Sequence, residues 1–206
     1  MTKAWGKVLL ATCVTVLAAG CGGGGQDTPK ATVEKMFKSL KNGDRVQFMA
    51  CFEATPEQTE FLNAMAGFGE ASKQFEDVCI RKFGEDAWKK SQTGKRGGRP
   101  FGEEPPLDKA DVKIDGEKAT IALPDQAQPM VLVKKGGIWK IDASALEPAT
   151  SAEDVKEAAK MMNAMADALK VAAAEADKAG ATIESVQAKM AEEIMNVMMR
   201  MAPKNP

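Results

Sequence analysis

The sequence predicts an α+β fold, in which N-terminal helices pack on a curved antiparallel β-meander and a C-terminal antiparallel helical hairpin follows. Three observations support this prediction. Apolar residues recur at helical spacing over residues 29–83. Apolar and polar residues alternate over residues 112–141, around two turns that contain glycine. Beyond residue 150 the helical spacing returns, now with many alanines and methionines.

The first helix is expected to begin at residue 29. Thr28 suits the N-cap, where its hydroxyl accepts a hydrogen bond from a backbone N–H, and Pro29 suits the first turn. Gly43 suits the left-handed position after the helix end. The apolar face of this helix is expected to consist of Val33, Met36, Phe37 and Leu40.

A short second helix is expected next, with Asp44 as its N-cap. Helical spacing predicts that its apolar face consists of Val46, Met49 and Phe52.

A long third helix is expected from residue 56, because Thr55 and Gln58 form a capping box around Pro56. Gly67 and Gly69 lie inside it, where each costs about 1 kcal/mol relative to alanine and a kink can form. Its broad apolar face is expected to consist of Phe61, Leu62, Met65, Phe68, Phe75, Val78, Cys79 and Phe83.

Residues 91–108 lack periodicity and are rich in glycine, proline and charge, so they are expected to form a mobile, solvated loop. The alternative is contact with anionic lipid headgroups, since each basic residue near a charged surface contributes about 1 kcal/mol. The basic residues in question are Lys89, Lys90, Lys95, Arg96 and Arg99.

Four strands are expected in the meander. Asp115-Gly116 is a strong hairpin signal between the first two strands, and Lys135-Gly136-Gly137 separates the last two. Such a sheet must bury one face, and the preceding helices are the available partner.

Heptad spacing beyond residue 150 predicts an antiparallel pair of helices that turns at Gly180. Because the hairpin alone buries little, we expect it to dock on the α+β domain or on another chain. Two heptad lines define the first helix, Val155, Met162, Leu169, Ala176 and Ala158, Met165, Ala172, Ala179. The matching stripe of the second helix is Ile183, Val186, Met190, Ile194, Val197 and Met201.

The N-terminus has the features of an export signal: Lys3 and Lys7 precede an apolar run that is too short to span a membrane. The run ends in Leu17-Ala18-Ala19-Gly20-Cys21, which resembles the bacterial lipobox. The resemblance implies cleavage before Cys21, a diacylglycerol on its sulfur and an acyl group on its new amino terminus. By family analogy, Gly22 favours the outer membrane, facing the periplasm. Several acyl chains hold a protein stably on a bilayer.

Composition narrows the possible activities. After removal of residues 1–20, 26 basic and 29 acidic residues remain, which argues against nucleic-acid binding. The chain has no histidine, so it has no Ser-His-Asp arrangement and no histidine-based zinc site. We expect no metal and no cofactor.

Cys51 and Cys79 are the two cysteines that remain after signal removal and lipidation. In an oxidising compartment they are expected to form a disulfide, which would close a loop of about 29 residues and contribute roughly 3–4 kcal/mol. The alternative is that both are small buried hydrophobes.

Two stretches resemble the cystatin-like cone of nuclear-transport-factor-2-like domains, as found on small bacterial lipoproteins. They are Pro29-x3-Val33-x3-Phe37-x2-Leu40-Lys41-x-Gly43-Asp44 and Val131-Leu132-Val133-Lys134-Lys135-Gly136-Gly137-Ile138-Trp139-Lys140-Ile141-Asp142. The resemblance covers about residues 29–144. It implies a curved sheet around a helix, with a mouth that can hold a small ligand or partner.

We therefore expect a non-catalytic, membrane-anchored binding module, which takes a protein partner through the hairpin or a small apolar ligand in the cone. An isomerase or dehydratase of the cone fold is the first alternative, but no tyrosine is present and Asp44, Asp77 and Asp142 are better explained as caps or surface charges. Copper binding by the C-terminal methionines is the second. The chain is divided into a signal peptide (1–20), the lipidated cysteine with a flexible linker (21–28), the cone-like domain (29–147) and the hairpin (148–206).

Overall fold

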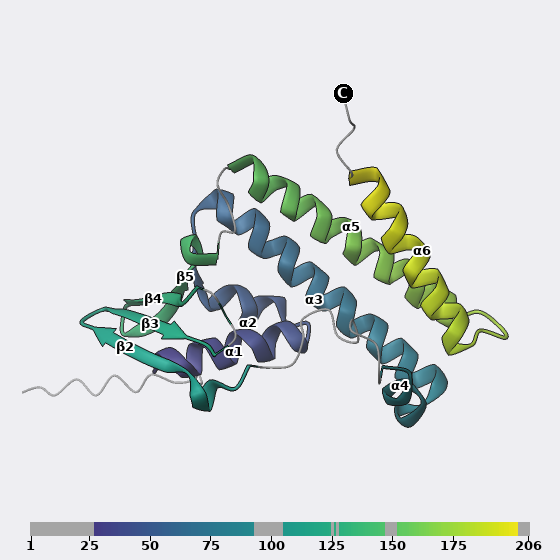
Figure 1. Cartoon of the computed structure of the whole chain (residues 1–206), viewed down its shortest axis with the longest axis horizontal. Helices are drawn as coiled ribbons and strands as arrows, with labels where there is room; N and C mark the ends of the chain where they lie inside the picture. Colours follow the sequence, from purple (N-terminus) through teal and green to yellow (C-terminus); the bar gives the residue numbers. More distant parts are fainter. Residues whose placement is uncertain (1–26, 93–104, 125, 127, 147–151, 202–206) are drawn as a thin grey trace, which may run out of the picture.

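The computed structural model describes residues 27–92, 105–124, 126, 128–146 and 152–201. A sheet with two short helices occupies one end of the molecule, and long helices extend from it to the other end (Figure 1). This arrangement confirms the α+β class. The signal peptide and Cys21 lie outside the described residues. Within the described part, no helix is both long enough and apolar enough to cross a membrane.

Local sequence signals place the first two helices correctly. Helix α1 spans Pro29–Lys41, and the Thr28 hydroxyl accepts a hydrogen bond from the Ala31 N–H at 3.2 Å. Gly43 follows the helix with a φ of 66°. Helix α2 spans Arg45–Ala50, and the Asp44 carboxylate caps it.

The predicted apolar face of α2 is wrong at Val46 and omits Phe48, whereas Met49 and Phe52 pack in or against the first core. Val46 is 80% exposed, whereas Phe48 is completely buried. Phe52 lies beyond the helix in a short strand, β1 (Phe52–Glu53), and its ring is 4.9 Å from that of Phe48. Because the helix ends at Ala50, the helical spacing that joined Val46 to Phe52 does not apply, and Phe48 faces the core instead.

Helix α3 is a single helix over Pro56–Phe83, and the capping box of Thr55 and Gln58 is present. Its two interior glycines have different surroundings. A Cβ added at Gly69 would lie 2.8 Å from Leu40 Cδ1 and from the Leu40 carbonyl oxygen, whereas nothing lies within 4 Å at Gly67. Gly69 therefore permits the close approach of α1 to α3, and Gly67 has no such packing role.

Helix α4 (Glu85–Gln92) follows Gly84 and was not expected from the sequence. Two short 3₁₀ helices, Leu107–Lys109 and Ala143–Leu146, flank the meander. Of the predicted loop over residues 91–108, residues 93–104 lie outside the described residues.

The sheet has the strand order β1-β5-β4-β3-β2. Both predicted hairpins are present, since β2–β3, β3–β4 and β4–β5 pair antiparallel. The short strand β1 was not predicted, and it pairs parallel with β5, so the sheet is mixed. The four predicted strands are β2 (Asp111–Asp115), β3 (Lys118–Ala122), β4 (Met130–Lys135) and β5 (Ile138–Asp142).

The first hydrophobic core lies between this sheet and helices α1, α2 and the first half of α3. Thr32 of α1 is buried there and donates a hydrogen bond to the Trp139 carbonyl of β5 at 3.1 Å, which joins helix and sheet. The largest fully buried side chains of this core are Phe48, Leu62, Ile121, Leu132 and Ile141.

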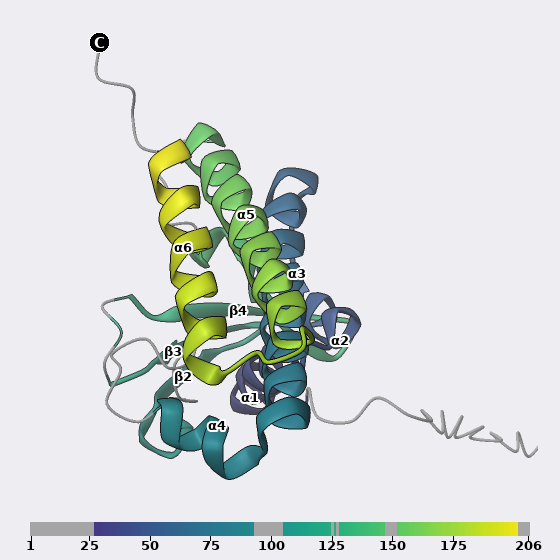
Figure 2. The same cartoon turned by 90° about the vertical axis from the view of Figure 1, so that its right-hand side faces the viewer.

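The second core shows that the C-terminal hairpin docks on its own chain. Helices α5 (Ala152–Ala176) and α6 (Ile183–Met201) form the hairpin, and α5 lies between α3 and α6 (Figure 2). Its buried residues come from α3, α4 and both hairpin helices: Ala71, Phe75, Cys79, Trp88, Ala166, Leu169, Ala172, Ala176 and Val186. Helix α3 thus contributes to both cores.

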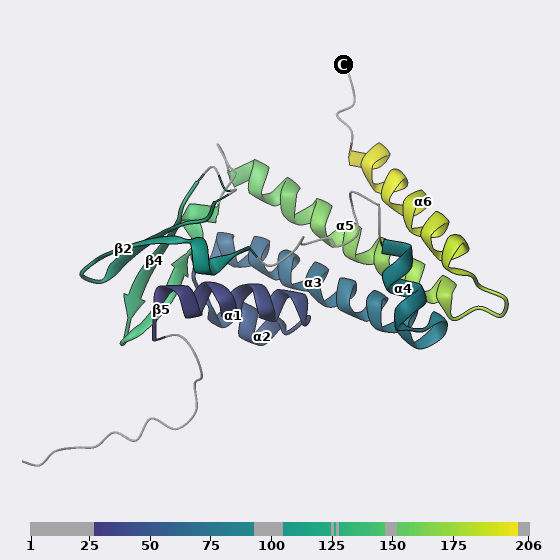
Figure 3. The ribbon, with the colours of Figure 1, turned by 60° about the horizontal axis from the view of Figure 1, so that its bottom comes forward.

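The heptad prediction for the hairpin is correct in part. Val155, Leu169, Ala172 and Ala176 are buried, but so are Ala159, Ala166 and Ala168 outside the predicted lines. The reason is that α5 is covered on two sides. The predicted stripe of α6 is buried or half-buried throughout. Toward its C-terminal end, α6 diverges from α5 (Figures 1 and 3).

The expected disulfide is not formed in this structure. Both Cys51 and Cys79 are buried, and they belong to different cores. Cys51 is at the end of α2, beside β5, whereas Cys79 is close to the far end of α3. Burial, and then the charge of Glu76, raises the pKa of the Cys79 thiol to about 12, so this cysteine behaves as a small hydrophobe.

Candidate functional site

Trp88 and Trp139 are core residues. Trp139 of β5 is buried in the first core, and Lys134 Nζ lies 5.7 Å from the centre of its ring. Trp88 of α4 is buried in the second core, where it makes an edge-to-face contact with Phe75 at 5.5 Å. Neither residue lines either of the hollows described below.

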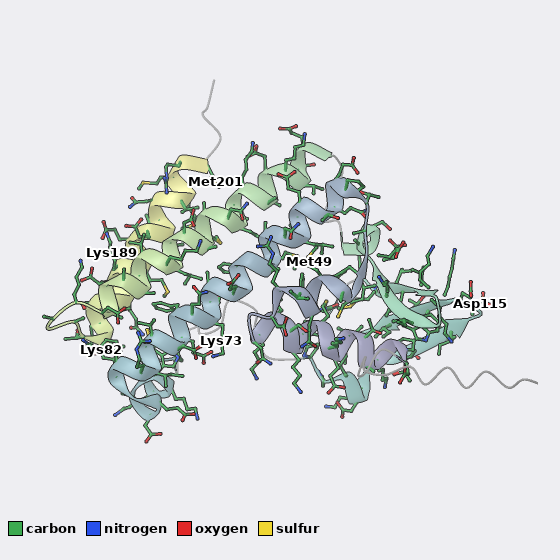
Figure 4. All side chains as sticks on the ribbon, turned by 180° about the vertical axis from the view of Figure 1, so that it is seen from behind. Met49, Lys73, Lys82, Asp115, Lys189 and Met201 are labelled. Carbon is green, nitrogen blue, oxygen red and sulfur yellow. The ribbon has the colours of Figure 1, made fainter. Side chains whose placement is uncertain are left out.

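The larger hollow is a groove of about 730 Å³ between α3 and α5, with Arg45 of α2 at its edge. These three helices lie together on the face seen in Figure 4. Four of the lining residues are small, namely Ala64, Gly67, Ala71 and Ala166. The rest of the lining is mostly polar: Arg45, Pro56, Thr59, Glu60, Asn63, Glu70, Gln74, Asn163, Asp167 and Lys170.

Charged and amide groups of both polarities line this groove. Arg45 Nη2 donates a hydrogen bond to Asn63 Oδ1 at 2.8 Å. On the opposite wall, Lys170 Nζ lies 2.9 Å from Asp167 Oδ1. Such a surface has no excess of one charge that would attract a polyanion or a metal cation. It suits a ligand that carries both hydrogen-bond donors and acceptors.

One residue, Gly67, signals this groove in the sequence. Gly67 is unfavourable inside a helix, and no packing contact in the described structure explains it. Because Gly67 lines the groove, we connect it with binding there. The other lining residues come from segments far apart in the chain, and only the docking of α5 on α3 brings them together.

A second candidate surface is the outer face of α6, which we call the methionine face. Met195, Met198 and Met199 are 54%, 50% and 62% exposed, and Ala188 and Ala191 beside them are also exposed. At intervals of three and four residues these side chains share one side of the helix, opposite Val186 and Val197, which are buried. Over residues 188–200 the polar residues are confined to one flank: Lys189, Glu192, Glu193, Asn196 and Arg200.

The polar flank of α6 is held by its own ion pairs. Lys189 Nζ lies 2.8 Å from Glu193 Oε1 and 3.2 Å from Glu192 Oε2. The hydrogen bond from Lys189 lowers the pKa of Glu193, and the same bond raises the pKa of Lys189. A hollow of about 410 Å³ on this flank is lined by Glu193, Asn196, Met199 and Arg200.

The aspartates considered for catalysis have structural roles. Asp44 caps α2, Asp77 pairs with Lys73 one turn earlier on α3, and Asp142 accepts hydrogen bonds from the backbone and hydroxyl of Ser144. Among the described residues, no group of three or more Cys, Asp or Glu side chains is arranged to hold a metal ion.

The methionines considered for copper binding differ in burial. On α5, Met161 is 40% exposed, while Met162 and Met165 are half-buried. On α6, Met195, Met198 and Met199 are exposed and Met201, at the helix end labelled in Figure 4, is half-buried. The exposed methionines that lie together on one helix are therefore those of α6.

Comparison of the chain with protein-family models, with curated proteins and with solved structures found no match.

Proposed function

We propose that this protein is a lipid-anchored binding module of the bacterial cell envelope, and that it binds a protein partner through the methionine face of α6. One observation carries the proposal: α6 is apolar on two opposite sides, and only one of them is covered in the described structure. An apolar side of a helix normally packs against another element, so the uncovered side of α6 is expected to bind a partner.

The chemistry of the face favours a protein partner. Methionine side chains are flexible and polarisable, so they adapt to apolar surfaces of different shapes, and the small Ala188 and Ala191 allow a partner helix to approach closely. The partner we expect is an amphipathic helix that lays its apolar side along α6. Copper binding is less favoured, because the exposed sulfurs belong to an outward helix surface rather than to an enclosed site.

The anchor and the cone are supported by the sequence. The lipobox-like segment ending at Cys21 supports lipid attachment, and a flexible linker would let the body stand off the bilayer. The packing of α1, α2 and the first half of α3 against the sheet supports the cone proposal. Because Trp139 and its neighbours fill the core, we favour the protein partner over an apolar ligand in the cone.

Protein from the membranes of its native host is expected to have the mass of residues 21–206 plus three acyl chains. We also expect reduction to leave this mass unchanged, because Cys51 and Cys79 are buried in different cores. Intact mass spectrometry with and without reductant tests both statements. A mass without acyl chains would contradict the anchor, and a rise of about two mass units on reduction would contradict the separation of the two cysteines.

The methionine face is tested by site-specific photo-crosslinking in native membranes, with the crosslinker at Met198 and a control at Val171, which is 42% exposed on α5. We expect a discrete adduct from Met198 alone. The captured protein is then purified and titrated against the full chain. Met198→Glu is expected to weaken its binding at least tenfold and Val171→Glu less than twofold, because a buried carboxylate without a partner is costly. Equal weakening by both variants, or by neither, would overturn the proposal.

A further inference from the structure

We propose that the groove between α3 and α5 binds an extended peptide segment, which it recognises mainly through the peptide backbone. This site is separate from the methionine face, which belongs to α6, and the two sets of lining residues do not overlap.

Gly67 is the first observation behind this inference. Glycine inside a helix costs about 1 kcal/mol relative to alanine, and Gly69 shows how packing can justify that cost. Gly67 has no atom within 4 Å of the place where a Cβ would stand, so no contact within the described structure requires glycine there. A missing side chain in the lining of a groove lets the backbone of a ligand come close.

The polar side chains of the groove match a peptide backbone. Asn63, Gln74 and Asn163 carry carboxamides, each of which has both a donor and an acceptor, as a peptide group does. Asn63 and Gln74 belong to α3 and Asn163 to α5, so both walls carry such groups. Charges of both signs are interspersed with them, which disfavours a ligand of strong single charge.

The dimensions also fit a chain segment. The lining residues of α3 run from Pro56 to Gln74, which is roughly 27 Å of helix at 1.5 Å per residue. An extended strand of about eight residues has the same length, at about 3.3 Å per residue. Small side chains, Ala64 and Ala71 of α3 and Ala166 of α5, line the part of this length that α5 faces.

The test begins with the full-length protein in detergent and a phage library of random decapeptides. Enriched peptides are synthesised, and their dissociation constants are measured by fluorescence anisotropy. We expect Gly67→Leu, which places a side chain on the groove floor, to weaken binding at least tenfold. Ala87→Leu is the control, because it adds a leucine side chain at an exposed position of α4, a helix that contributes no residue to the groove, and it should change binding less than twofold. Circular dichroism establishes that both variants fold.

Two further comparisons separate backbone recognition from other modes. Backbone N-methylation of an enriched peptide removes N–H donors and keeps every side chain, so it is expected to weaken binding at least tenfold. Met198→Glu should leave peptide binding unchanged, which keeps this result independent of the proposed function. Failure to enrich any peptide, equal binding to the wild type and Gly67→Leu, or tolerance of N-methylation would each overturn the inference.

Discussion

Replacing Phe48 by alanine is expected to lower the free energy of unfolding by about 3–5 kcal/mol, the usual cost of removing a buried aromatic side chain. Phe48 has no exposed surface, and it packs beside Phe52 where α2 leads into the sheet. The truncation therefore leaves a cavity bounded by a helix and a strand that cannot both move inward. Urea denaturation followed by circular dichroism measures the change.

Val46→Ala is the matched control for this prediction. Val46 is in the same six-residue helix but is 80% exposed, so we expect a change within about 0.5 kcal/mol. If Val46→Ala were as costly as Phe48→Ala, the face of α2 that the helical spacing predicted would be the buried one after all, and the described packing would be wrong.

Gly69→Ala is expected to destabilise the protein by about 1–3 kcal/mol, as overpacking of a tight contact usually does. The new methyl group would lie 2.8 Å from Leu40 Cδ1 and from the Leu40 carbonyl oxygen. The side chain can rotate away, but the carbonyl is backbone at the end of α1, so the two helices must separate. This cost exceeds the helix-propensity gain of about 1 kcal/mol.

Gly67→Ala, two residues earlier on α3, should have the opposite sign. Nothing lies within 4 Å of its added methyl group, so only the propensity gain remains and the free energy of unfolding should rise by about 1 kcal/mol. The pair isolates packing from propensity, since both changes are glycine to alanine in one helix. Two changes of the same sign would contradict the contact between Gly69 and Leu40.

The parts of the fold that local chemistry determines were predictable from the sequence. Thr28, Asp44 and Thr55 cap the helices they were expected to cap, and Asp115-Gly116 turns the hairpin between β2 and β3. Each of these signals acts over a few residues. The polar or glycine residue satisfies backbone groups, or adopts a backbone conformation, that its immediate neighbours require.

The parts that depend on tertiary packing were not predictable. A helix of six residues is too short for its spacing to show which side is buried, so Phe48 was missed. Strand β1 has two residues and becomes a strand only because β5 lies beside it. Helix α4 has eight residues and one buried residue, Trp88, so apolar spacing could not reveal it. The heptad lines of α5 could not show that two helices cover it.

The two candidate sites, the methionine face and the groove, also differ in how far the sequence predicts them. The exposed methionines of α6 follow from the sequence once one stripe of the helix is assigned to its partner. The groove does not, because its walls come from α2, α3 and α5 and form only when those helices meet.

Helix α3 couples the unfolding of the two hydrophobic cores. Its 28 residues are roughly 42 Å long, and they supply buried side chains to both cores. Loss of the hairpin would uncover the far half of α3, and loss of the sheet would uncover the near half. A helical segment of about half this length has marginal stability in water when nothing packs on it. Unfolding that starts in one core therefore destabilises α3, on which the other core also depends. Sheet and hairpin are therefore coupled into one cooperative unit through their common helix, without an extensive contact surface of their own.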